Sequence, residues 1–153
     1  MSEITEFAGQ LFFRLWRASH TRTAAALESL GLTTALFAVL NVLGARESAM
    51  QRELSSAMGI DPSTMVALVD DLEAKGLATR GRHPKDRRAW AVAITPAGRK
   101  TLERARRAAQ RVEDEVLGGL SEAERRRLLT LLHRALDAAP AQPPWHEAEV
   151  AST

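Results

Sequence analysis

The sequence predicts a mainly α-helical protein that carries one small β-hairpin, an α+β fold. Most of the chain places apolar residues at alternating three- and four-residue steps, which is helical spacing. One segment, AWAVAIT at residues 89–95, instead alternates large and small side chains, which is strand spacing. Glycines suited to helix C-termini separate the helical segments: Gly31, Gly44, Gly59, Gly76 and the pair Gly118–Gly119.

The N-terminal half of the chain predicts a series of helices. The first should cover about residues 3–30, and Thr33 should cap the second. Ser48 is expected to cap a short third helix. Asp61 and Pro62 suit the N-cap and the first position of a fourth helix. The inward stripe of that helix should comprise Met65, Leu68, Val69 and Leu72.

The C-terminal half predicts the hairpin and further helices. LATRGR, residues 77–82, should pair with AWAVAIT across a tip formed by HPKD. Thr95 and Pro96 should start a long helix, and Ser121 with Glu124 forms a capping box that starts the last one. Residues 140–153 contain three prolines and little periodicity, which indicates a disordered tail.

Two short helices joined at SAMGIDPST and followed directly by a basic hairpin are typical of a winged helix-turn-helix. We therefore assign residues 32–95 to a winged helix-turn-helix DNA-binding region. Residues 1–31 and 96–139 form a separate helical region.

The composition excludes several classes of protein. The chain has no cysteine, so disulfides and thiolate metal sites are excluded, and its four histidines show no metal-ligand spacing. A zinc site assembled in three dimensions stays open. We find no catalytic arrangement and expect neither an enzyme nor a cofactor. No apolar run reaches the roughly 18 residues of a membrane span, and the start MSEITEF is not a secretory signal. These features predict a cytoplasmic protein without a membrane partner.

The charge is concentrated in one band of the sequence. Residues 80–107 hold 10 basic and 2 acidic residues, a net charge of +8, whereas residues 1–79 and 108–153 each carry −3. A basic band in an acidic body indicates a surface that binds a polyanion. A solvated charged surface is the alternative.

Residues 63–80 (STMVALVDDLEAKGLATR) and 86–99 (DRRAWAVAITPAGR) resemble the MarR family of bacterial transcriptional regulators. The most specific mark is Asp86-x-Arg88 followed by a strand that ends Ile-Thr-Pro-x-Gly. The resemblance covers roughly residues 10–138. It implies a homodimer whose two winged motifs bind successive major grooves of a pseudo-palindromic operator in double-stranded DNA. The first and last helices, residues 1–31 and 96–139, would then be N- and C-terminal dimerisation helices, and a repressor is the expected role.

The resemblance also assigns DNA contacts. Arg88 is expected to enter the minor groove, where the phosphate potential attracts a guanidinium, and Asp86 is expected to brace the wing, perhaps through Arg80. The start of the fourth helix should read the major groove, since its N–H groups favour phosphate and its hydroxyls can reach base edges. The predicted DNA-binding residues are Pro62, Ser63, Thr64, Arg80, Arg82, Lys85, Asp86, Arg87 and Arg88.

Simpler interpretations exist for the same residues. Ser63 and Thr64 are also good helix-start residues, and Asp86 with Arg88 could form a surface ion pair worth at most about 1 kcal/mol. Ala67 and Asp71 stand where family members often carry basic residues, so specificity should depend more on hydroxyls and DNA shape.

Many family members release DNA when a small aromatic or phenolic acid enters a crevice between the dimerisation helices and the winged domain. The candidate ligand-binding residues are Phe13, Trp16, Arg17, His20 and Phe37. Aromatic walls with Arg17 or His20 would suit an aromatic anion. The alternative is that the aromatic residues belong to the core or to the dimer interface.

The leading hypothesis is therefore a dimeric, sequence-specific DNA-binding regulator. The alternative is a winged-helix module that binds protein or RNA through the same basic surface. Asp86 and Arg88 on the wing favour the first, because a protein-interaction module does not need them.

Overall fold

The computed structural model of the chain describes residues 7–83 and 86–139, except for the side chains of residues 83–89. The predicted tail, residues 140–153, lies outside the described residues. Within these ranges the elements follow in the order α1 (Ala8–Glu28), α2 (Thr34–Arg46), β1 (Ser48–Met50), α3 (Gln51–Met58), α4 (Pro62–Ala74), β2 (Ala78–His83), β3 (Asp86–Ile94), α5 (Pro96–Val116) and α6 (Glu122–Ala138).

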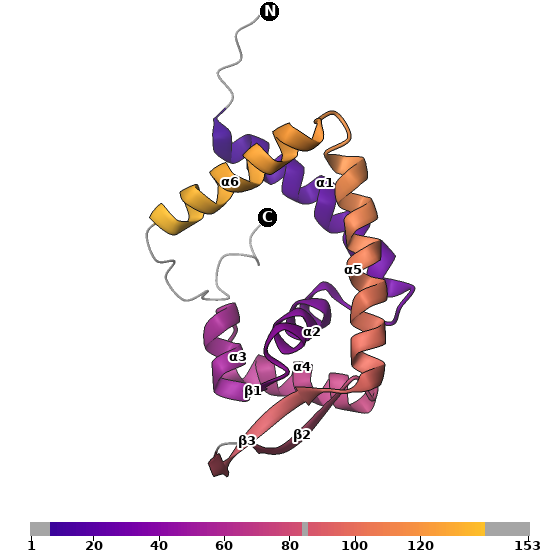
Figure 1. Cartoon of the computed structure of the whole chain (residues 1–153), viewed down its shortest axis with the longest axis vertical. Coiled ribbons are helices and arrows are strands. Elements are labelled where there is room, and N and C mark those ends of the chain that lie inside the picture. Colours follow the sequence, from indigo (N-terminus) through magenta and orange to yellow (C-terminus); the bar gives the residue numbers. More distant parts are fainter. Residues whose placement is uncertain (1–6, 84–85, 140–153) are drawn as a thin grey trace, which may run out of the picture.

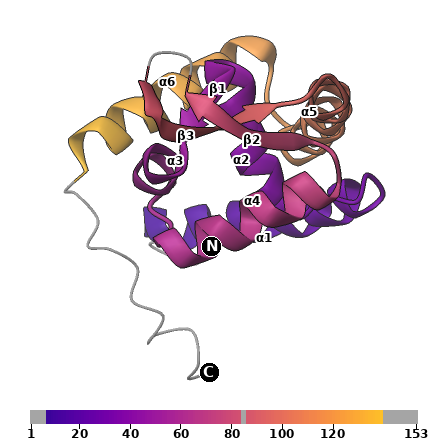
Figure 2. The same ribbon diagram turned by 90° about the horizontal axis from the view of Figure 1, so that it is seen from below.

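The elements form two regions connected by α5. α2, α3, α4 and the sheet form one end of the molecule, and α1 and α6 cross each other at the other end (Figure 1). α5 leaves the sheet at Pro96 and runs along the molecule, packing against both α1 and α2. Seen from below, the hairpin lies beside α3 and α4 (Figure 2). This arrangement is a winged helix-turn-helix, and it confirms the predicted fold class.

The sheet is antiparallel with the strand order β1-β3-β2. β3 pairs with β2 through Arg80 and Val92, and with β1 through Ala49 and Val92. The prediction that Ser48 caps a helix is wrong, because Ser48 begins strand β1. α3 instead starts after Met50, whose backbone N–H donates to the Glu53 carboxylate at 2.8 Å.

The first helix starts at Ala8 rather than near residue 3, whereas the four other predicted helix caps are confirmed. The side chains of Thr33, Asp61, Thr95 and Ser121 each accept a hydrogen bond from a backbone N–H three residues later. Satisfying these unpaired donors fixes the first turn of each helix. The local sequence therefore determines where most of the helices begin.

Gly44 does not end a helix, which corrects a further expectation. It lies inside α2, where a Cβ atom would come 2.4 Å from the Leu102 Cδ2 atom of α5. Gly44 therefore allows close packing of α5 on α2.

The buried core belongs mainly to the winged region. Fully buried side chains come from the end of α1 and from α2, α3, α4 and β3: Leu27, Leu36, Val39, Leu40, Leu43, Leu54, Met65, Val69, Leu72 and Val92. The predicted stripe of α4 faces this core, with Leu68 partly buried at its edge. Burial of the stripe leaves the opposite face of α4 in solvent.

The surface of α1 and α6 remains apolar and exposed. Phe12, Phe13 and Trp16 of α1 are each more than half exposed, and Leu136 of α6 is 70% exposed. None of the residues of α6 is buried. None of the described helices is both long and apolar enough to span a bilayer.

Candidate nucleic-acid interface

The first turn of α4 is exposed at the surface of the winged region. Pro62, Ser63 and Thr64 all lie in solvent, on the element that the sequence predicts to read DNA. Val66 is 41% exposed and Ala67 is exposed, so the outer face of this half of the helix is small and uncharged. Such a face can approach base edges closely, because no long side chain holds the helix away.

Asp61 fixes this turn. Its Oδ1 atom accepts hydrogen bonds from the Ser63 hydroxyl and from the Thr64 backbone N–H, the latter at 2.9 Å. The Ser63 hydroxyl and then Thr64 lower the pKa of Asp61 well below its usual range, so the cap is charged at neutral pH. Because the Ser63 hydrogen is directed to Asp61, its oxygen remains free to accept a hydrogen bond.

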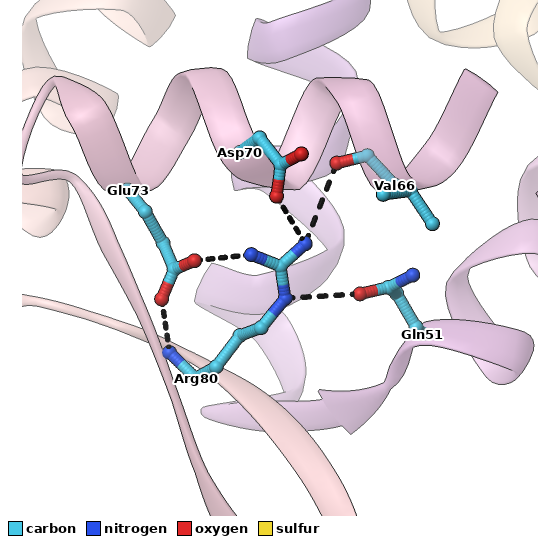
Figure 3. A network of polar contacts seen from close by, with 5 residues as sticks. All are labelled: Gln51, Val66, Asp70, Glu73 and Arg80. Atoms are coloured by element: carbon cyan, nitrogen blue, oxygen red, sulfur yellow. Dashed lines mark hydrogen bonds and ion pairs between the residues drawn. The ribbon is translucent and has the colours of Figure 1, made fainter. Parts of the chain in front are cut away.

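Arg80 at the root of the hairpin connects three elements (Figure 3). Its guanidinium binds Glu73 and Asp70 of α4, the latter through Nη2 to Oδ1 at 2.7 Å. Its Nε donates to Gln51 Oε1 of α3 at 3.1 Å, and its backbone N–H donates to Glu73 Oε1 at 2.7 Å. Arg80 therefore holds β2, α3 and α4 in a fixed relative position.

The ion pairs of Arg80 with Asp70 and Glu73 keep its guanidinium charged and so strengthen the connection between the hairpin and α4. Partial burial opposes the charge of Arg80, but its hydrogen bonds with Asp70 and Glu73 outweigh it and raise the pKa of Arg80. The Arg80 side chain is 26% exposed, against 59% for Asp70. The Asp86 side chain lies outside the described residues, so its expected role of bracing the wing, perhaps through Arg80, stays a prediction.

The three acidic residues of α4 all have cationic partners. Asp70 and Glu73 are paired with Arg80, and Asp71 lies 3.5 Å from the Lys75 ammonium. These pairs reduce the negative potential that would otherwise repel phosphate from this helix.

Further out on the hairpin, Arg82 lies over Trp90. The two residues face each other across β2 and β3, and the guanidinium carbon is 4.8 Å from the centroid of the indole ring. This is a cation–π arrangement. Trp90 is 59% exposed, so its ring contributes a surface for Arg82 rather than core packing.

The remaining predicted wing residues are only partly described. Asp86, Arg87 and Arg88 lie on strand β3, but their side chains are outside the described residues, as is Lys85 altogether. Of these residues, Asp86 pairs with His83 through the backbone at the outer end of the hairpin.

A basic groove at the end of α2 was not predicted from the sequence. Arg46 of α2 and Arg52 of α3 line a hollow of about 490 Å³ together with Glu53, Ser56 and Ala57. The sequence gives little indication of this groove, because Arg46 and Arg52 are separated by strand β1 and lie outside the basic band, residues 80–107.

The five candidate ligand-binding residues occupy three different settings. Phe13, Trp16 and His20 stack along α1, with ring centroids 6.2 Å and 4.8 Å apart in successive pairs. Arg17 instead lines a surface groove with Arg14, Ala18, Thr21 and Arg22. Phe37 is partly buried against the core.

An apolar cavity lies where α1, α5 and α6 meet. It has a volume of about 340 Å³ and is lined mainly by aromatic and aliphatic side chains, among them Phe12, Trp16, Leu128 and Leu132. Of the candidate ligand-binding residues, Trp16 lines it. Within residues 7–83 and 86–139 no cluster of three or more His, Asp or Glu side chains could hold a metal ion.

The sequence of the winged region matches that of known regulators. Residues 30–89 match the model of the MarR family. A Thauera aromatica protein, named provisionally as a transcriptional regulatory protein for the hcr operon, is 36% identical over 133 residues. The match spans 83% of this chain and 79% of the relative.

Solved structures match the whole arrangement. A MarR variant from E. coli complexed with operator DNA superposes with a TM-score of 0.72 at 25% identity, covering 84% of this chain and 92% of that one. BpsR from Bordetella bronchiseptica, whose DNA binding is regulated by 6-hydroxynicotinic acid, gives a TM-score of 0.75 at 28% identity. The match covers 91% of this chain and 99% of BpsR.

Proposed function

Because the chain belongs to the MarR family, we propose that it is a homodimeric transcriptional repressor that binds a pseudo-palindromic operator. α4 reads the major groove from its first turn, and the wing reaches the adjacent minor groove. Its place of action is the cytoplasm, where it meets double-stranded DNA. The proposal makes the protein a regulator rather than an enzyme.

The observation that carries the proposal is the fixed geometry between α4 and the hairpin. Arg80 binds both Asp70 and Glu73 of α4, so the reading helix and the wing move as one unit. Preorganisation of this kind reduces the entropy lost when both elements bind DNA. We assign Arg80 this positioning role rather than direct DNA contact, because its Nε, Nη1 and Nη2 atoms already donate to protein oxygens.

Direct contact falls to other residues of α4 and of the wing. Ser63 and Thr64 face base edges, and Pro62 allows the N-terminus of α4 to approach the backbone. On the wing, Arg82 binds phosphate from its position over Trp90, and Lys85 and Arg87 add further phosphate contacts. Arg88 enters the minor groove, and Asp86 orients it. Arg46 at the end of α2 and Arg52 on α3, the first helix of the motif, add a phosphate-binding edge.

The homodimer is supported by the exposed apolar surface of α1 and α6. Large side chains there, including Phe12, Phe13 and Leu136, are more than half exposed in the single chain. Contiguous apolar surface of this kind marks a protein interface. A second copy of the chain covers it and places two winged regions side by side.

Release by a small aromatic acid is the proposed regulation. BpsR responds to an aromatic acid, and the cavity between α1, α5 and α6 is apolar and of suitable size for one ring system. Trp16 lines this cavity, and Phe13 and His20 stack on Trp16 along α1. Arg17 and Phe37 lie in other settings, so we give them no direct role in this cavity.

Fluorescence anisotropy on duplex DNA tests the function. The protein is titrated against DNA from upstream of its own gene and against a scrambled duplex, across a series of salt concentrations. A dimer that neutralises about six to eight phosphates should give a log–log salt slope near −5 to −7. A preference of at least about 10³ for one sequence is expected of a specific regulator.

Arg88→Ala is the variant that tests the wing. It should weaken DNA binding by about 1–3 kcal/mol, because a minor-groove guanidinium is lost, and leave the melting temperature nearly unchanged. Unaltered affinity for the selected duplex would remove Arg88 from the interface. Weak, equal affinity for every duplex, with binding to RNA or to a protein instead, would support the winged-helix interaction module.

A further inference from the structure

A groove of about 450 Å³ lies between the last turn of α1 and the middle of α5. Arginine side chains and small or apolar ones combine in its walls. The lining includes Arg104, Arg107 and Arg111 of α5 beside Ala26, Leu30 and Ala108. The groove therefore offers positive charge around a partly apolar floor.

The spacing of the three arginines gathers their charges on one face of α5. They stand at positions i, i+3 and i+7, which lie next to each other on a helix. Like charges so placed repel one another and lower helix stability. An anion bound among them would remove this repulsion.

The three arginines differ from Arg99 and Arg106 of the same helix in having no partner among the described residues. Arg99 lies 3.4 Å from Glu47 Oε1, and Arg106 Nε donates to Asn41 Oδ1 at 2.8 Å. Arg104, Arg107 and Arg111 form no hydrogen bond or ion pair with any residue in the described part of the chain. Three arginines without a partner among the described residues thus gather in the groove.

The proposed DNA contact does not account for these charges. α5 starts at Pro96 beside the sheet, and Arg104 and Arg111 follow it by 8 and 15 residues. At a rise of 1.5 Å per residue they lie about 12 and 22 Å along the helix from the wing. Figure 1 shows α5 leading away from the hairpin over this length.

We propose that this groove is a binding site for a small organic anion that carries two or more phosphate or carboxylate groups. Guanidinium groups match both kinds of oxyanion through paired hydrogen bonds. The anionic groups lie among Arg104, Arg107 and Arg111, and a short apolar part of the ligand contacts Ala26, Leu30 and Ala108. The site is separate from the DNA-binding surface and from the apolar cavity beneath α6.

Isothermal titration calorimetry of the full chain without DNA tests the site. Pyrophosphate and citrate serve as probes at constant ionic strength, and they distinguish phosphate from carboxylate preference. One saturable site per chain is expected. The variant Arg104→Gln/Arg107→Gln/Arg111→Gln should weaken binding at least about ten-fold, since each guanidinium contributes a charge-assisted contact.

A matched control removes three exposed arginines of α6 by Arg126→Gln/Arg127→Gln/Arg134→Gln, and it should retain the affinity of the parent. Circular dichroism shows whether both variants are folded. Absence of saturable binding for both probes, or equal weakening in the two variants, would overturn the proposal. A third result would also overturn it: the parent binds neither probe, and the groove variant loses DNA affinity and the salt dependence of DNA binding. The three arginines would then contact DNA. Since these titrations contain no DNA, their outcome is independent of the operator-binding test.

Discussion

At the scale of single residues, Arg80 shows that a basic residue in a basic hairpin can bind carboxylates of its own chain. Charge alone places it in the predicted DNA-binding set, since it opens the segment RGRHPKDRR. Its partners Asp70 and Glu73 lie three residues apart on α4 and could not be matched to it from the sequence. Two carboxylates at that spacing are unexpected on a helix predicted to bind DNA. They could have indicated that a basic residue of the chain pairs with them.

Arg80→Ala should lower both stability and DNA affinity. The free energy of unfolding should fall by about 1–3 kcal/mol, because hydrogen bonds with charged partners are lost and two carboxylates remain side by side. Urea unfolding measures the first effect and anisotropy the second. Arg126→Ala on the exposed surface of α6 is the control. Equal losses in the two variants would show that Arg80 does not connect the hairpin to α4.

Trp90→Leu should weaken DNA binding two- to five-fold without a comparable loss of stability. The indole holds Arg82 in place, and a cation–π contact at an exposed site contributes about 0.5–1 kcal/mol. Trp90→Phe keeps an aromatic face and should retain most of the affinity. Anisotropy titrations compare the three proteins. If Leu and Phe behave alike, the ring has no part in orienting Arg82.

At the scale of elements, the fold follows closely from helix caps and apolar periodicity. Thr33, Asp61, Thr95 and Ser121 mark helix starts because each cap acts on backbone groups only three residues away. Strand β1 was missed for the opposite reason. It has three residues, and its register with β3 joins Ser48 to Ala93, a pairing across a long stretch of sequence.

Gly98 explains part of the sequence fingerprint in structural terms. A Cβ atom at this position would lie 2.0 Å from the Leu77 carbonyl oxygen, and the Thr95 hydroxyl donates to Gly76 O at 2.7 Å. The first turn of α5 is thus packed directly on the backbone that leads into β2. Only a residue without a side chain permits this contact.

Gly98→Ala should destabilise the winged region, because the added methyl group would push α5 away from the backbone before β2. Overpacking of a close contact costs about 1–3 kcal/mol. Gly9→Ala in α1 is the control, since no atom lies within 4 Å of its added Cβ, and it should be neutral or slightly stabilising. Thermal unfolding followed by circular dichroism compares the two. A Gly98→Ala protein as stable as the Gly9→Ala protein would contradict the packing described for α5.

At the scale of the whole molecule, the core lies at one end and the exposed apolar surface at the other. The winged region buries its own leucines, whereas α6 has no buried residue in the single chain. The resemblance implied that the first and last helices form the dimer. The sequence could not assign the aromatic residues of α1 to core, cavity or surface, because that assignment depends on how α1 crosses α5 and α6.

Leu136→Glu should convert the dimer to a monomer that keeps the winged fold. Leu136 is 70% exposed, so a charge there leaves the core intact but opposes the burial of this surface against a second copy. Light scattering gives the mass and circular dichroism the helix content. A Leu136→Glu protein that remains dimeric would remove this end of α6 from the interface.

In the proposed complex two α4 helices, each fixed to its wing, read successive major grooves. Hydroxyl-radical footprinting on the duplex selected by anisotropy shows whether they do. Two protected patches are expected, with centres about one helical turn, 10–10.5 base pairs, or a multiple of it apart, and related by an approximate two-fold axis. Protection that is uniform along the duplex, or confined to one patch without a symmetric counterpart, would contradict this arrangement.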